Sequence, residues 1–111
     1  MAKHSDELDT VLIALADPTR RSIIRLLGAG PATVGTLAEP FDITLPSFMK
    51  HIRSLERAGV IHTSKSGRVR TCELDRARLS IVDDWLADER ALWNARTDRL
   101  EQMVTNPEEP S

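Results

Sequence analysis

Apolar residues recur at every third or fourth position along much of the chain, a period that predicts helices. A first short amphipathic helix is expected over residues 8–15. A second follows in the stretch ADPTRRSIIRLLGAG. Asp17 is a natural N-cap there, Pro18 suits the first helical position, and Gly28 and Gly30 end the helix.

The stretch from residue 33 to residue 61 predicts two further helices separated by a short turn. Thr33 can cap a short third helix, and Thr44 can cap the fourth. In the fourth helix Phe48, Ile52 and Leu55 follow an i, i+4, i+7 spacing and are expected to point inward. The outward positions then belong to Ser47, Lys50, His51, Arg53 and Arg57.

After this helix the sequence favours β-strands. The runs VIHTSK and RVRTCEL are rich in β-formers and are joined by a turn that contains Ser-Gly, which predicts a hairpin. Lys65 and Arg68 lie at its tip, and Arg70 lies just beyond. The order helix, short turn, helix, basic hairpin predicts a mainly α fold with a small β-hairpin wing, the winged helix-turn-helix. In that arrangement the second helix of the pair enters the major groove and the wing contacts the neighbouring backbone.

Residues 75–104 predict a long last helix with apolar residues on two sides. One seam repeats every seven residues and consists of Leu79, Leu86, Trp93 and Leu100. Ile81, Trp85 and Leu92 form a second stripe. Such a helix has more apolar surface than one small domain can cover, so we expect it to form a homodimer interface; a single wide stripe on one core is the alternative. We expect one domain over residues 1–104, with 75–104 as the dimerisation helix, and a disordered polar tail over 105–111.

Charge changes the picture, because the net charge of −2 hides a basic segment. From Thr44 to Cys72 six Lys and Arg residues accompany one acid, Glu56, whereas the rest of the chain carries nine cations and sixteen acids. A solvated helix and hairpin would explain this, but agreement with the wing pattern favours a double-stranded DNA site. The candidate DNA contacts are Thr44, Pro46, Ser47, Lys50, His51, Arg53, Lys65, Arg68 and Arg70. His51 could instead pack against a neighbouring turn.

Three stretches resemble the ArsR-type winged-helix repressors of bacteria: LADPTRRSIIRLL, TVGTLAEPFDITLPSFMKHIRSLERAGVI and SGRVRTCEL. The resemblance implies a homodimer that binds palindromic operator DNA, usually as a repressor. The Asp-Pro-Thr-Arg opening and the Trp-rich last helix resemble a branch without metal sensing. Met49, Ile52 and Cys72 depart from the residues common in the family. Since the first two bear on the sequence read, no operator is predicted.

The sequence predicts no metal site and no cofactor. Metal-sensing members of the family use a Cys motif in the third helix or Asp, His and Glu sets on the dimer helix. Here the third helix, TVGTLAEP, has no thiol or imidazole, and the last helix has carboxylates but no His. Carboxylates alone make a poor soft-metal site. A metal- or redox-responsive repressor is the alternative, although a lone thiol such as Cys72 is more often a small hydrophobe.

Other classes fit poorly. Ser47 and His51 are four residues apart, but no acid is placed to orient the imidazole and no glycine-rich turn supplies an oxyanion hole, so we expect no enzyme. No signal-like stretch and no apolar run of about 18 residues indicates secretion or a membrane, and the lone cysteine fits a reducing cytoplasm. A winged-helix module that binds protein is a further alternative. That function would not explain the positive charge of the segment from Thr44 to Cys72. Nothing identifies a small-molecule inducer.

Overall fold

The computed structural model describes residues 3–105, with side chains from residue 6 to residue 104. The chain forms two compact units, and the boundary falls between Ile81 and Val82. Most of the predicted disordered tail lies outside the described residues, and its first residue, Thr105, is the last of the final helix.

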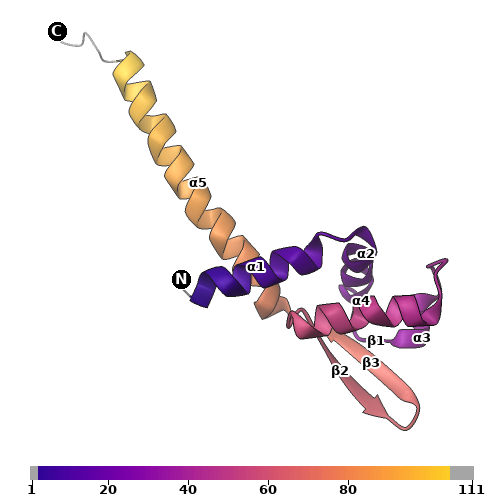
Figure 1. Ribbon diagram of the computed structural model, residues 1–111. Coiled ribbons are helices and arrows are strands. Elements are labelled where there is room, and N and C mark those ends of the chain that lie inside the picture. Colours follow the sequence, from indigo (N-terminus) through magenta and orange to yellow (C-terminus); the bar gives the residue numbers. More distant parts are fainter. Residues whose placement is uncertain (1–2, 106–111) are drawn as a thin grey trace. The chain divides into compact units, whose positions relative to one another are not determined.

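All four helices predicted before the hairpin are present, and the first begins at Lys3, five residues earlier than predicted (Figure 1). They are α1 (Lys3–Leu15), α2 (Pro18–Leu27), α3 (Val34–Ala38) and α4 (Leu45–Arg57). The three predicted N-caps are confirmed. Asp17 accepts the main-chain N–H of Arg20 at 3.0 Å, Thr33 that of Thr36 at 3.1 Å, and Thr44 that of Ser47 at 3.3 Å.

The predicted hairpin is β2 (Ile61–Ser66) with β3 (Val69–Leu74), and it projects beyond the helices as a wing (Figure 1). Its two-residue loop is Gly67–Arg68. Gly67 has φ 63°, the positive value that a type II′ turn needs at its first central residue. A third strand, β1 (Ala32–Thr33), pairs antiparallel with β3, giving the order β1-β3-β2. The sequence pattern does not predict β1, because two residues are too short to show a period.

The core of the first unit is aliphatic around one aromatic ring. Phe48, Ile52 and Leu55 are fully buried, which confirms the predicted inward face of α4. Further fully buried side chains come from α1, α2, α3, the residue before β2, and the sheet: Val11, Ile23, Leu27, Leu37, Val60, Ile61 and Cys72. α4 is therefore held rigidly by its inner face, and its outer face is left for other contacts.

The last helix, α5 (Arg76–Thr105), is capped by Asp75, which accepts the main-chain N–H of Arg78 at 2.9 Å. Its first turn is tied to the first unit, since Arg76 donates to Gly28 O at 3.0 Å and Arg78 donates to Ala58 O at 2.9 Å. From Val82 onward α5 is the described part of the second unit. Of the predicted seam, Leu79 and Leu86 are half-buried, whereas Trp93 and Leu100 are exposed in the single chain.

Candidate nucleic-acid interface

The first turn of α4 is exposed to solvent and presents small polar groups. Thr44 caps it, and its hydroxyl also donates to Ser47 Oγ at 3.1 Å. Pro46 occupies the first turn, where it needs no N–H partner. The N-terminal end of a helix this long favours a negatively charged partner, because its first N–H groups and the helix dipole point outward.

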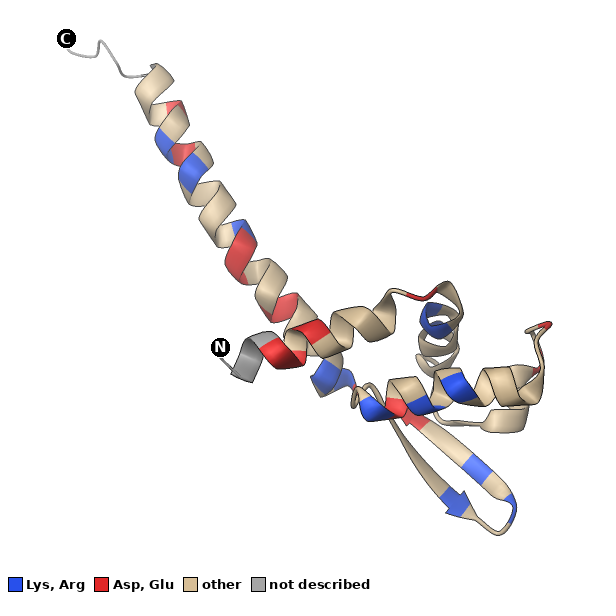
Figure 2. Cartoon of the chain, viewed as in Figure 1, with Lys and Arg blue, Asp and Glu red and all other residues tan. Residues whose placement is uncertain are grey.

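Cations follow along the same helix and continue on the wing (Figure 2). Lys50 and Arg53 on α4 are exposed, as are Lys65 and Arg68 on the hairpin. Among the residues that the structure describes, none of these four forms an ion pair. Their charges are thus available to a partner of opposite sign.

His51 differs from its neighbours on α4. Its Nδ1 lies 3.7 Å from Asp17 Oδ2, and its side chain is only 23% exposed. Burial opposes ionisation of Asp17, but the main-chain N–H of Arg20 and the nearby His51 outweigh it and lower the pKa of that carboxyl. This contact with the start of α2 matches the packing alternative, and a DNA contact of His51 stays a prediction.

The wing places two like charges side by side. Lys65 and Arg70 are direct cross-strand partners and so share one face of the hairpin. Arg70 donates to Thr63 Oγ1 at 2.9 Å, and the Thr63 hydroxyl donates to Glu56 Oε2 at 2.7 Å. The one acid of the basic segment therefore joins α4 to the wing through Thr63.

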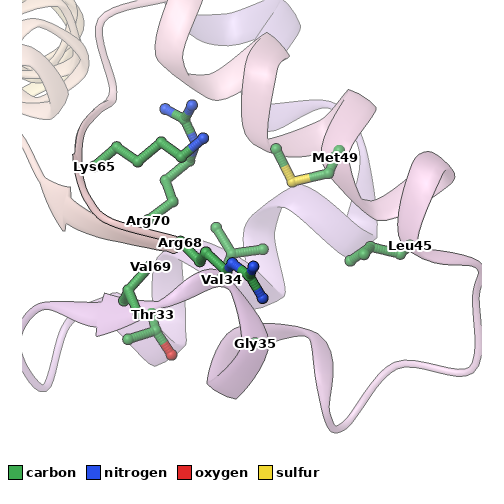
Figure 3. A pocket seen from close by; sticks show the side chains of 9 residues that line it. All are labelled: Thr33, Val34, Gly35, Leu45, Met49, Lys65, Arg68, Val69 and Arg70. Atoms are coloured by element: carbon green, nitrogen blue, oxygen red, sulfur yellow. The ribbon is translucent and has the colours of Figure 1, made fainter.

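A groove of about 480 Å³ lies between α4, the start of α3 and the wing (Figure 3). Its wall on the wing carries Lys65, Arg68 and Arg70, and no acid lines it. The remaining residues are small or apolar: Thr33, Val34, Gly35, Leu45, Met49 and Val69.

The apolar members of this groove are absent from the candidate DNA contacts that the sequence predicts. Leu45 lies three residues before Phe48, outside the predicted inward face of Phe48, Ile52 and Leu55. In the structure it is 59% exposed, because the core ends before the first turn of α4. Its place in the sequence could have indicated this exposure. Leu45 directly follows the N-cap Thr44, and a residue there projects past the elements that bury the rest of the helix.

Cys72 is fully buried on β3. Burial, and the nearby Glu56 carboxylate, raise the pKa of its thiol. Elsewhere in the described part of the chain, no three His, Cys, Asp or Glu side chains are grouped so that they could hold a metal ion. Neither the Cys72 thiol nor the described His, Asp and Glu side chains therefore support regulation by metal or by oxidation.

Residues 15–64 match a family model described as a helix-turn-helix domain. The transcriptional repressor SdpR of Bacillus subtilis is 35% identical over 79 residues, which is 71% of this chain and 88% of the relative. An arsenical resistance operon repressor of Staphylococcus xylosus is 31% identical over 69% of this chain and 74% of its own length.

Solved structures agree with these relatives. The crystal structure of an ArsR-family transcriptional regulator shares 51% identity and a TM-score of 0.80, over 85% of this chain and 97% of that one. The chain belongs to the ArsR family. An ArsR-like transcriptional regulator from Rhodococcus sp. RHA1 has 26% identity and a TM-score of 0.79, over 92% of this chain and 96% of that one.

As an ArsR-family member, the protein is a DNA-binding transcriptional regulator with a winged helix-turn-helix fold and is not an enzyme. Its helix-turn-helix pair is α3 and α4, and its wing is the β2–β3 hairpin. No described helix of this ArsR-family chain is long and apolar enough to cross a membrane.

Proposed function

We propose that this protein is a homodimeric repressor that acts in the cytoplasm and binds an inverted-repeat operator. The observation that carries the proposal is that Lys50 and Arg53 on α4 and Lys65 and Arg68 on the wing are exposed and, among the described residues, form no ion pair, and that the two wing residues also line the groove. One duplex can meet both elements at once, with α4 in the major groove and the wing along the adjacent backbone.

Every candidate residue except His51, which lies against Asp17, then has a role. Thr44, Pro46 and Ser47 meet the base edges with the first turn of α4. The cations contact phosphates: Lys50 and Arg53 from α4, and Lys65, Arg68 and Arg70 from the wing. These backbone contacts set the orientation, whereas the first turn selects the sequence.

The pairing of Lys65 with Arg70 supports this assignment. Like charges directly opposite in a β-hairpin are destabilising. A polyanion on that face of the wing removes the repulsion, so the pair favours the bound state over the isolated hairpin.

The exposed apolar residues of α5 support the dimer. Trp85, Leu92 and Trp93 are each 42–47% exposed in the single chain, and Leu100 is 61% exposed. A second copy would cover such a surface. A two-fold dimer places two copies of α4 on one side of the duplex, which predicts half-sites about 34–36 Å apart.

Electrophoretic shifts test DNA binding directly. The protein should retard random duplex at low salt. Its complex with a site selected from a random library should persist at higher salt concentrations. Footprinting on the DNA upstream of its own gene should reveal two protected half-sites related by inversion. Absence of any shift at low salt by folded protein contradicts the proposal.

A further inference from the structure

Four apolar side chains line the groove beside three cations, Thr33 and Gly35 (Figure 3). Leu45 is 59% exposed and Val69 is 50% exposed, while Val34 and Met49 are half-buried. Such side chains do not bind phosphate, and exposed ones add little to the core. Their position calls for a partner that brings apolar surface as well as negative charge.

Leu45 and Met49 form the apolar wall that belongs to α4. They are four residues apart, so they share one face of the helix, and both line the groove (Figure 3). They lie in the first part of α4, the region of a recognition helix that meets base edges. The apolar group that DNA presents on base edges in the major groove is the C5-methyl of thymine.

We propose that Leu45 and Met49 read thymine by packing against its C5-methyl group, at one or two positions in each half-site. The proposal rests on the DNA-binding mode proposed above and adds the base that this part of α4 selects. Apolar contact discriminates thymine from cytosine, whose edge has no methyl group at C5 and a different hydrogen-bonding pattern.

The opposite wall of the groove fits the same occupant. Lys65, Arg68 and Arg70 supply charge complementarity to the phosphates of the strand that carries the thymine. A second copy of the chain docked in the groove would bring the same three cations against them. A thymidine-containing strand therefore suits both walls, whereas self-association through the groove does not.

The test starts from the site that the native chain selects out of a random duplex library. Each thymine of that site is replaced singly by deoxyuridine, which removes the methyl group and keeps the O4 acceptor and the base pairing. We expect affinity to fall about fourfold at one or two positions per half-site, the effect of burying one methyl-sized group. Thymines elsewhere in the site should tolerate the change.

Leu45→Ala and Met49→Ala connect this effect to the two side chains. Each variant should bind the native site more weakly and should no longer distinguish thymine from deoxyuridine at its position, as a double-mutant cycle measures. Leu26→Ala is the matched control, because Leu26 is 41% exposed on α2 and does not line the groove. The Leu26→Ala variant should distinguish thymine from deoxyuridine as strongly as the native protein does.

Thermal unfolding verifies that the variants fold, and Met49→Ser or Leu45→Gln replaces any variant that does not. The proposal is overturned if no selected thymine responds to removal of its methyl group. It is equally overturned if sensitive thymines stay sensitive in both groove variants. In either case the native chain still binds its selected site and the proposed function stands, whereas failure of the native chain to bind any duplex overturns that function itself.

Discussion

His62 Nε2 lies 2.6 Å from Asp75 Oδ2, and this contact joins the first strand of the wing to the cap of α5. The other carboxylate oxygen of Asp75 accepts the main-chain N–H of Arg78 at 2.9 Å. The hydrogen bond from His62, followed by that from Arg78, lowers the pKa of the Asp75 carboxyl below its ordinary 3.8. One side chain thus stabilises the junction of wing and α5.

Asp75→Ala should lower the free energy of unfolding by about 0.5–2 kcal/mol at neutral pH, because it removes an N-cap. A carboxyl with a lowered folded-state pKa stabilises the fold above its unfolded pKa, and the stabilisation is lost as pH falls through the folded value. The difference between native protein and variant should therefore shrink as pH falls below about 3.8. Denaturant unfolding across a pH series measures it.

Asp75→Asn serves as the control, since asparagine caps helices nearly as well as aspartate. It should retain most of the neutral-pH stability without the acid dependence. An Asp75→Ala penalty that stays the same down to about pH 2.5, well below the ordinary range of the carboxyl, would show that ionisation of Asp75 is irrelevant to stability.

Arg68→Ala should weaken binding to matched and scrambled DNA alike. Arg68 lies in the two-residue turn of the wing and is exposed, so we expect it to contact phosphate. The slope of log K against log[salt] should become shallower by about 0.9 for each phosphate that each subunit no longer neutralises. Titrations over a salt series measure the slope.

Arg25→Ala is the matched control for the wing, because Arg25 is an exposed arginine near the end of α2. It should leave the slope near the native value. If Arg68→Ala leaves a steep native slope unchanged, the wing tip does not contact DNA.

Ser47→Ala should instead change specificity. Ser47 lies in the exposed first turn of α4, and alanine leaves its main-chain N–H to Thr44 in place. Discrimination at one base pair per half-site should fall by about 1–3 kcal/mol if the hydroxyl contacts a base directly. Binding to sites with each base at that position measures the change. A uniform weakening across all bases would instead assign Ser47 to the backbone.

The helices and the hairpin could be predicted because their signals are local. Asp17, Thr33 and Thr44 cap helices through contacts only three residues away, and the inward face of α4 follows from spacing alone. The roles of Arg20 and Arg21 could not be predicted in this way. Arg20 donates to Ala14 O at 2.7 Å and Arg21 to Leu15 O at 2.8 Å, so these arginines of α2 cap the end of α1.

The candidate site divides along the same line. Exposed cations on α4 and the wing follow from charge and period, and the structure does expose Lys50, Arg53, Lys65 and Arg68. The groove could not be predicted, because it forms between α3, α4 and the wing, which are brought together by the fold. His51 illustrates the same limit, since its neighbour Asp17 is 34 positions away in the chain.

DNA affinity should not respond to stoichiometric Zn²⁺, Cd²⁺ or arsenite. The prediction follows from the absence of clustered thiols and imidazoles in the sequence, where the single cysteine is buried at Cys72. Shift assays with and without each ion, together with calorimetry, provide the measurement. Tight uptake of one ion per subunit that is abolished when Asp or His side chains are replaced would contradict it.

Trp93→Asp should convert the dimer into a monomer. Trp93 is 47% exposed in the single chain and lies on the seven-residue seam of α5, so a partner copy would bury it. A buried unpaired carboxylate costs several kcal/mol, on the order of 3–5 for an uncompensated charge. Asn94→Asp adds the same charge at the next, exposed position and should leave the dimer intact. Sedimentation at micromolar concentration distinguishes the two species.

Since paired half-sites need two copies of α4, the monomer should also lose preference for the inverted repeat over a single half-site. A native chain that sediments as a folded monomer would remove α5 as an interface and leave its exposed apolar residues without this explanation.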